Sequence, residues 1–176
     1  MKFNSTDIDG LYYVDIDRLE DERGFFGRAF CSQEFEKINL DSEVCQANIS
    51  YNHSAGTLRG MHYQKSPYQE SKFIRCIKGS IYDVVIDLRK NSPTYCHWFG
   101  IELNDKNRTA LFVPKDFAHG FVTLADDTEV IYLVSQSYVP NAEKGIRWDD
   151  PFFAIDWPIS PSLVSSKDAQ WPDFST

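Results

Sequence analysis

Short runs of β-branched and aromatic residues, separated by polar turns, dominate the middle of the chain. The clearest is KFIRCIKGSIYDVVIDLR (72–89), which predicts two strands around a turn at Lys78-Gly79-Ser80. The same pattern continues in three further stretches: HWFGIELN (97–104), RTALFVP (108–114) and HGFVTLADDTEVIYLVSQSYV (119–139). Strands at this spacing with polar turns are typical of a β-sandwich, a jelly roll or a small barrel.

The two ends of the chain follow other patterns. SQEFEKIN (32–39) predicts a short helix with Ser32 as its N-cap and with Phe35 and Ile38 on one face. Residues 148–174 are rich in proline and tryptophan and lack periodicity, so we expect loops with short helical turns, packed over the open end of a barrel. The pattern as a whole predicts an all-β fold, and the length of 176 residues predicts a single domain spanning 1–176.

Composition narrows the possible partners. Hydrophobic residues form 42% of the chain, enough for a packed core, and the net charge of −8 argues against binding nucleic acid or an anionic membrane. Binding of a small anionic ligand remains possible at a place where a few cationic side chains converge.

The N-terminal residues form no apolar leader and no stretch reaches about 18 apolar residues, which favours a cytoplasmic location. Four widely spaced cysteines without a CxxC pair indicate free thiols.

The four histidines raise the question of a metal site. A metal in a barrel of this kind needs three or four converging ligands, commonly beginning with an H-x-H pair on one strand. His53, His62, His97 and His119 form no such pair, and the sequence therefore predicts no bound metal. A structural role in the core is the ordinary alternative for any one of them.

His62 has unusual neighbours for a core histidine. Arg59 precedes it by three residues, Lys72 follows it by ten, and strand alternation places Gln64 on the same face. His119 is followed by a glycine, which permits close approach of another strand. Burying these cations together without an anionic ligand would be costly, so the cluster favours a binding cavity.

These residues belong to motifs that resemble one family. The sequence resembles the dTDP-4-dehydrorhamnose 3,5-epimerases, which act on nucleotide-linked 4-keto-6-deoxysugars, have a cupin-like jelly-roll fold and use no metal or other cofactor. The matching segments run in family order along most of the chain: DERGFF (21–26), QANIS (46–50), GTLRGMHYQ (56–64), KFIRCIKGSIYDVVIDLR (72–89), SPTY (92–95), VPKDFAHGF (113–121), EVIYLVSQSYVP (129–140), EKGIRWDDP (143–151), IDWP (155–158) and SSKD (165–168).

The resemblance implies a role for each matching residue. His62 would be the general base with Asp168 as its orienting partner, Tyr132 the acid on the opposite face, and Lys72 the group facing the sugar's C4 oxygen. The implied ligand-binding set is larger: Arg23, Arg59 and His119 for the pyrophosphate or sugar, Gln46 and Asn48 near the nucleotide, Tyr138 stacked on the base, and Glu143 and Lys167 for the remaining contacts.

The residue types suit the implied chemistry. A ketone at C4 acidifies the hydrogens on C3 and C5, and a histidine backed by a carboxylate is a suitable base near neutral pH. An ammonium near O4 stabilises the enolate charge. Inversion needs a proton from the other face, which a tyrosine supplies. By default, Tyr132 and Tyr138 would be packing residues of a sheet and Asp168 a solvated loop carboxylate.

One position departs from the family pattern. Arg28 stands where the family has a glutamate that contacts the ligand. An arginine donates hydrogen bonds and would suit the acceptors of cytosine, whereas a carboxylate accepts from thymine or uracil. The nucleotide, dTDP or CDP, therefore stays open, as does inversion at C3, C5 or both.

Two other functions remain as alternatives. One is a sugar-nucleotide ketoisomerase, although His62 together with Tyr132 favours epimerisation. The other is a non-catalytic jelly-roll module, which outward-pointing side chains of Lys72 and Asp168 would favour. The resemblance also implies a homodimer with strands exchanged or packed across the interface, and the aromatic content of 15% leaves surface for one.

Overall fold

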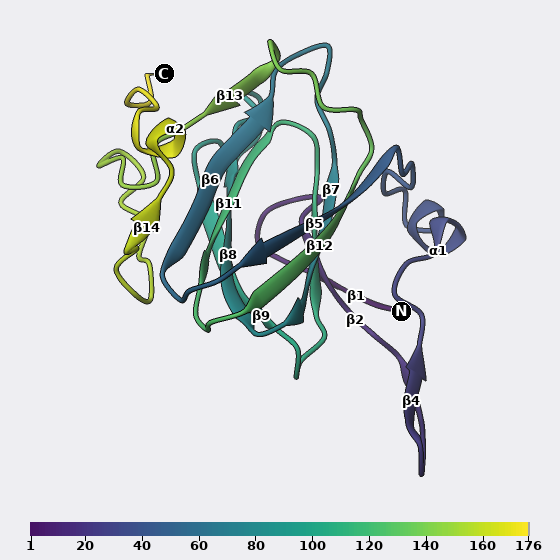
Figure 1. Ribbon diagram of the computed structural model, residues 1–176. Coiled ribbons are helices and arrows are strands. Elements are labelled where there is room, and N and C mark those ends of the chain that lie inside the picture. The colour runs from purple at the N-terminus through teal and green to yellow at the C-terminus, as the bar shows by residue number, and fades with distance from the viewer. Residues whose placement is uncertain (176) are drawn as a thin grey trace.

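Two antiparallel sheets face each other in the computed structural model, which describes residues 1–175 (Figure 1). The all-β class is confirmed, and the opposed sheets form the expected jelly roll. None of the helices in these residues is long and apolar enough to cross a membrane.

The first sheet has six strands in the order β1-β2-β10-β7-β12-β5. All of its neighbouring strands are antiparallel. Their bounds are Lys2–Ser5 (β1), Tyr12–Asp15 (β2), Ala110–Val113 (β10), Lys72–Lys78 (β7), Thr128–Val134 (β12) and Gln46–Asn52 (β5).

The second sheet has the order β13-β6-β11-β8-β9, and β14 pairs with β6 in parallel. Its strands are Glu143–Gly145 (β13), Thr57–Gln64 (β6), Phe117–Thr123 (β11), Ser80–Asp87 (β8), Trp98–Asn104 (β9) and Leu163–Val164 (β14). A separate two-stranded arm, β3 (Arg18–Asp21) and β4 (Gly24–Gly27), projects away from both sheets (Figure 1).

The two strands predicted within 72–89 are both present, but they do not pair with each other. β7 belongs to the first sheet and β8 to the second, so the turn at Gly79 carries the chain across the sandwich. Gly79 has a φ of +77°, and a Cβ there would lie 2.4 Å from Thr128 Oγ1. Glycine is therefore needed at this crossing.

Strand alternation explains the layers. Inward side chains of both sheets form the central core, including Ile74, Leu111, Ile81, Val85 and Leu103, all fully buried. A second cluster on the outer side of the second sheet is covered by the C-terminal segment, and a third on the first sheet is covered by α1. Each sheet thus buries both faces over part of its area.

The predicted helix is shorter than expected. α1 spans Ser32–Glu36, with Cys31 in extended conformation as its N-cap and no side-chain cap, so Ser32 is the first helical residue rather than the cap. A left-handed Asn39 (φ +61°) and a bond from Leu40 N to Phe35 O (3.0 Å) end the helix early. Phe35 is fully buried, but Ile38 lies beyond the end of the helix, is 37% exposed and does not join Phe35 in the core.

The C-terminal segment has the loops and helical turn that its composition predicts. α2 spans Ser166–Ala169 and lies beside β6 (Figure 1). The Ser165 side chain caps it by accepting from Asp168 N at 3.0 Å. This cap fixes the orientation of α2, which places Lys167 and Asp168 in the wall of a cavity between the sheets.

Candidate active site

A cavity of about 970 Å³ lies between the two sheets, with the C-terminal segment as one wall. Eleven of the thirteen residues predicted for the site line it: Gln46, Asn48, Arg59, His62, Lys72, His119, Tyr132, Tyr138, Glu143, Lys167 and Asp168. The sequence motifs therefore converge in space, although they come from both sheets and from α2.

A β-bulge places two of these residues on the same wall. His62 of β6 is opposite His119 of β11, and Arg59 is opposite Phe121, so β6 has one extra residue in this stretch. Simple alternation would send Arg59 and His62 to opposite faces, but the bulge turns both side chains into the cavity.

Two glycines allow the bulge to form. Gly60 has a φ of +134°, and a Cβ there would lie 2.4 Å from the Cα of Gly120. A Cβ on Gly120 would in turn lie 2.8 Å from Arg59 O. The "RGMH" and "HGF" motifs therefore bring two backbones together at this point, and larger residues would push them apart.

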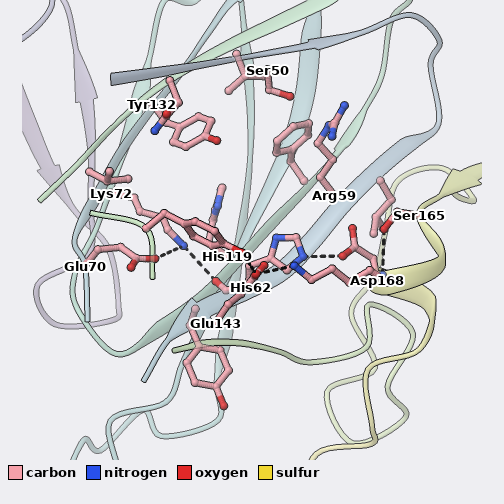
Figure 2. Close-up of a pocket in the computed structure, with 18 of the residues that line it drawn as sticks. Ser50, Arg59, His62, Glu70, Lys72, His119, Tyr132, Glu143, Ser165 and Asp168 are labelled. Carbon is pink, nitrogen blue, oxygen red and sulfur yellow. Dashed lines mark hydrogen bonds and ion pairs between the residues drawn. The ribbon is translucent and has the colours of Figure 1, made fainter. Parts of the chain in front are cut away.

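His62 forms a close pair with Asp168. His62 Nε2 and Asp168 Oδ1 are 2.6 Å apart (Figure 2). Gly60 N lies 3.4 Å from Asp168 Oδ2. The carboxylate is only 4% exposed. Burial opposes the ionisation of Asp168. The hydrogen bond from His62, the charge of His62 and the hydrogen bond from the Gly60 amide outweigh burial and hold the pKa of Asp168 below its ordinary value. Asp168 thus remains ionised behind the imidazole, which leaves the other ring nitrogen, Nδ1, for a ligand.

The opposite wall carries Tyr132 and Lys72. Tyr132 lies on β12 and Lys72 begins β7, both in the first sheet, whereas His62 lies in the second (Figure 2). Burial raises the pKa of Tyr132, and the charge of Arg59 opposes that rise in part. The phenol is therefore protonated at neutral pH and can act as a donor.

Lys72 is held by two acceptors at the cavity wall. Its Nζ lies 3.1 Å from Glu70 Oε1 and donates to His62 O at 3.2 Å. Glu70 also lines the cavity. No periodic signal in the sequence distinguishes Glu70.

A second histidine–aspartate pair lies close to the first. His119 Nε2 and Asp83 Oδ1 are 2.5 Å apart, Asp83 is fully buried, and its Oδ2 has no partner within the described chain. The pairing arises because β11 and β8 are neighbours with His119 and Asp83 on the same inner face.

Three polar side chains in the outer part of the cavity, Tyr138, Glu143 and Lys167, bond to one another. Tyr138 Oη donates to Glu143 Oε2 at 2.5 Å, and Lys167 Nζ lies 2.5 Å from the same oxygen. Burial raises the pKa of Glu143, but the hydrogen bonds from Lys167 and Tyr138 outweigh this effect and hold the pKa below its ordinary value. Gln46 Oε1 accepts from Tyr138 N at 2.9 Å, which ties the Tyr138 loop to β5.

Arg23 and Arg28 do not reach this cavity within the chain. Arg23 lies at the turn of the β3–β4 arm, 84% exposed, and pairs with Asp21 at 2.5 Å. Arg28 follows the arm and pairs with Glu34 of α1 at 2.6 Å. The arm extends away from the sandwich, which is why sequence proximity to a motif did not bring these two side chains into the site (Figure 1).

Across residues 1–175, no three His, Cys, Asp or Glu side chains gather as a metal site would require. The cavity does hold a histidine–carboxylate pair on one wall, and a phenol and an ammonium on the other. Such a set can remove a proton from one side of a ligand and return one from the other. Fold and site together define a cupin-like jelly-roll protein with acid–base groups inside its barrel.

Comparison with known proteins identifies the family. The family model described as dTDP-4-dehydrorhamnose 3,5-epimerase matches residues 5–176. The enzyme of that name from Methanothermobacter thermautotrophicus is 40% identical over 97% of this chain and 92% of its own. A dTDP-4-dehydrorhamnose 3-epimerase from Streptomyces niveus is 35% identical over 96% of this chain and 81% of its own.

A solved structure agrees with the sequence comparison. The 3,5-epimerase of Bacillus anthracis, solved with TDP and pyrophosphate bound, has a TM-score of 0.95 and 38% identity, covering 98% of this chain and 99% of its own. The chain therefore belongs to the dTDP-4-dehydrorhamnose 3,5-epimerase family, whose members are isomerases. The resemblance inferred from the motifs is confirmed.

Proposed function

We propose that this protein inverts both C3 and C5 of dTDP-4-dehydro-6-deoxyglucose, with His62 as the base and Tyr132 as the acid. The observation that carries the proposal is their placement on opposite walls of one cavity, with Asp168 2.6 Å behind the imidazole. Inversion requires removal and return of a proton on opposite faces of a carbon, and these two walls supply the two groups.

The mechanism follows from these positions. His62 Nδ1 removes the proton next to the C4 ketone, and Asp168 stabilises the imidazolium that results. The Lys72 ammonium stabilises the negative charge on O4 of the enolate. Tyr132 then donates its phenolic proton to the opposite face of the carbon, which leaves Tyr132 as a phenolate and His62 protonated. Proton exchange with solvent returns both groups to their starting states, and the same two steps then invert the second centre.

The rest of the cavity suits a nucleoside diphosphate. Arg59 and His119 are the nearest candidates for the pyrophosphate, since both point into the cavity between the sheets. Gln46 and Asn48 would contact the nucleotide and Tyr138 would stack on its base, with Glu143 and Lys167 completing the contacts. Binding of TDP by the Bacillus anthracis relative supports thymidine as the nucleoside.

We also propose that residues 1–176 act as one domain in the cytoplasm, as part of a homodimer. All four cysteines are free thiols, as in reducing compartments. Five large apolar side chains on the arm and on β5, the edge strand of the first sheet, are at least 40% exposed, an unusual cost for a monomer: Leu19, Phe25, Phe26, Ile49 and Tyr51. A second copy packed on them would bury this surface.

A dimer would also give Arg23 a function. Its arm extends away from its own cavity, so exchange across the interface would carry Arg23 toward the partner's cavity. We expect Phe26→Ser to shift the protein to monomer in analytical ultracentrifugation, while Phe152→Ser, an exposed residue of the C-terminal segment, leaves the dimer intact. Mixing Arg23→Ala with His62→Ala should restore activity that neither variant has; failure to do so argues against exchange.

The substrate is tested by comparing matched nucleotide sugars. With dTDP- and CDP-linked 4-keto-6-deoxyglucose, we expect turnover of the dTDP sugar, because Arg28 is already paired with Glu34. A preference for the CDP sugar would instead support base reading by Arg28. Inversion at C3 alone would favour the second candidate, a 3-epimerase like the Streptomyces niveus relative.

A further inference from the structure

Glu70 occupies the cavity wall beside the proposed catalytic lysine. Its side chain is only 9% exposed, and that of Lys72 only 12%. Glu70 Oε1 lies 3.1 Å from Lys72 Nζ (Figure 2). The other oxygen of Glu70, Oε2, accepts from Gln64 Nε2. Each carboxylate oxygen thus has its own donor.

We propose that Glu70 is a positioning residue for the reaction, acting through Lys72. The inference rests on the proposed function, in which Lys72 faces O4 of the sugar. An ammonium has three N–H groups, and Glu70 and the carbonyl of His62 occupy two of them. The third is left for the cavity, so these two acceptors set the direction in which Lys72 meets a ligand.

The hydrogen-bond inventory requires a carboxylate at this position. Two donors, Lys72 Nζ and Gln64 Nε2, point at the two oxygens of Glu70. A glutamine has one acceptor oxygen and an NH₂ group, so one of the two donors would face another donor. A flip of Gln64 offers no relief, because Gln64 Oε1 already accepts from Val139 N at 2.7 Å.

Gln64 links this wall to the loop of Tyr138. In addition to Val139 N, it contacts Ser137 O, with Nε2 donating at 3.2 Å. These bonds flank Tyr138 on both sides, and Gln64 Nε2 also donates to Tyr68 O at 3.1 Å, so Gln64 keeps these other partners when the Glu70 carboxylate is lost. Loss of the Glu70 carboxylate should therefore disturb Lys72 while leaving the proposed nucleotide contacts in place.

The first test is Glu70→Gln, which preserves side-chain size. We expect kcat on dTDP-4-dehydro-6-deoxyglucose to fall between about 10- and 100-fold, as for a misplaced catalytic group. KM and the Kd for dTDP alone, measured by calorimetry, should stay within about threefold. Glu36→Gln, a matched change at an exposed glutamate of α1, should leave kcat unchanged.

The second test distinguishes positioning from general stability. In a Lys72→Met background, Glu70→Gln should cause no further loss of solvent deuterium incorporation, because the group on which Glu70 acts is gone. A purely structural role predicts the same loss in both backgrounds. The melting temperature of each variant shows whether the fold is retained.

The outcomes separate this inference from the proposed function. A wild-type protein that turns over no nucleotide 4-keto sugar overturns the proposed function. Normal wild-type turnover with an unaltered kcat in Glu70→Gln overturns only the positioning role, as does a full additional loss in the Lys72→Met background.

Discussion

The Asp168 carboxylate is the group whose removal tests the proposed base most selectively. Asp168 accepts from His62 at 2.6 Å and from the Gly60 amide at 3.4 Å, and it is nearly fully buried. Asp168→Asn keeps the shape of the side chain and removes its charge. If the amide oxygen faces His62, the hydrogen bond is neutral and weaker; if the NH₂ group does, the imidazole must adopt the other tautomer.

The magnitude follows from these two outcomes. With the NH₂ group facing it, His62 carries its proton on Nδ1, the nitrogen that faces the cavity, and cannot act as a base there. Comparable aspartate-to-asparagine changes behind a catalytic histidine reduce kcat by up to about 10⁴-fold, and we expect a loss of roughly 10²- to 10⁴-fold here. That loss corresponds to about 3 to 5 kcal/mol in the activation free energy.

Stability should change much less than activity. Loss of one charge-assisted hydrogen bond costs about 1 to 3 kcal/mol, or roughly 3–10 °C in melting temperature for a chain of this size. Asp87→Asn is the matched control, since Asp87 is another fully buried aspartate, bonded to Arg89, Ser92 and Thr94 away from the cavity. It should lower the melting temperature and keep kcat.

We would measure kcat from initial rates followed by proton NMR at pH 7.5. Circular dichroism melts on the same samples would give the melting temperatures. The proposed role of Asp168 behind His62 is refuted if Asp168→Asn retains kcat within about threefold of wild type. It is equally refuted if Asp87→Asn loses as much activity as Asp168→Asn, because the effect would then follow stability.

Three further predictions follow from the same geometry. Tyr132→Phe should lower the rate of inversion by at least about 10²-fold. Deuterium incorporation, followed by NMR, should continue, since His62 can return a deuteron to the face from which it took the proton. Loss of both inversion and incorporation would contradict separate roles for the two residues. Tyr138→Ala should raise KM about tenfold or more with little change in kcat, from the lost stacking on the base, and an unchanged KM would place the base elsewhere. Although burial opposes ionisation, hydrogen bonds from Arg89 and its neighbours hold the pKa of Asp87 at about 2, so this group stabilises the fold above its unfolded pKa of 3.8. About 2 kcal/mol of unfolding free energy should be lost as pH falls from 4 to 2 in urea titrations, and less in Asp87→Asn.

The strands of the fold were predictable where hydrophobic runs were long. The stretch 72–89 gave two strands at nearly their observed bounds, because a glycine turn separates two apolar runs. Their assignment to different sheets was not predictable, since the turn residues alone do not encode which partner a strand takes. The short strands of residues 2–27 lacked a distinct pattern and were missed.

The residues of the site could be predicted from sequence motifs, but the arrangement of their side chains in space could not. Alternation along β6 would separate Arg59 from His62, and only the bulge at two packed glycines unites them. Asp168 looked like a solvated carboxylate because its burial depends on where α2 packs. Glu70 carried no signal at all, because its importance comes from the two donors around it rather than from its own position in a pattern.

Epimerisation at both carbons is tested most directly by solvent deuterium incorporation into dTDP-4-dehydro-6-deoxyglucose, incubated with the protein in heavy water and followed by proton NMR. With the wild-type protein, the signals of both H3 and H5 should be lost at a catalytic rate, with inversion at both carbons, and with His62→Ala they should remain. Retention of both signals with the wild-type protein, or undiminished exchange with His62→Ala, would contradict the proposed mechanism.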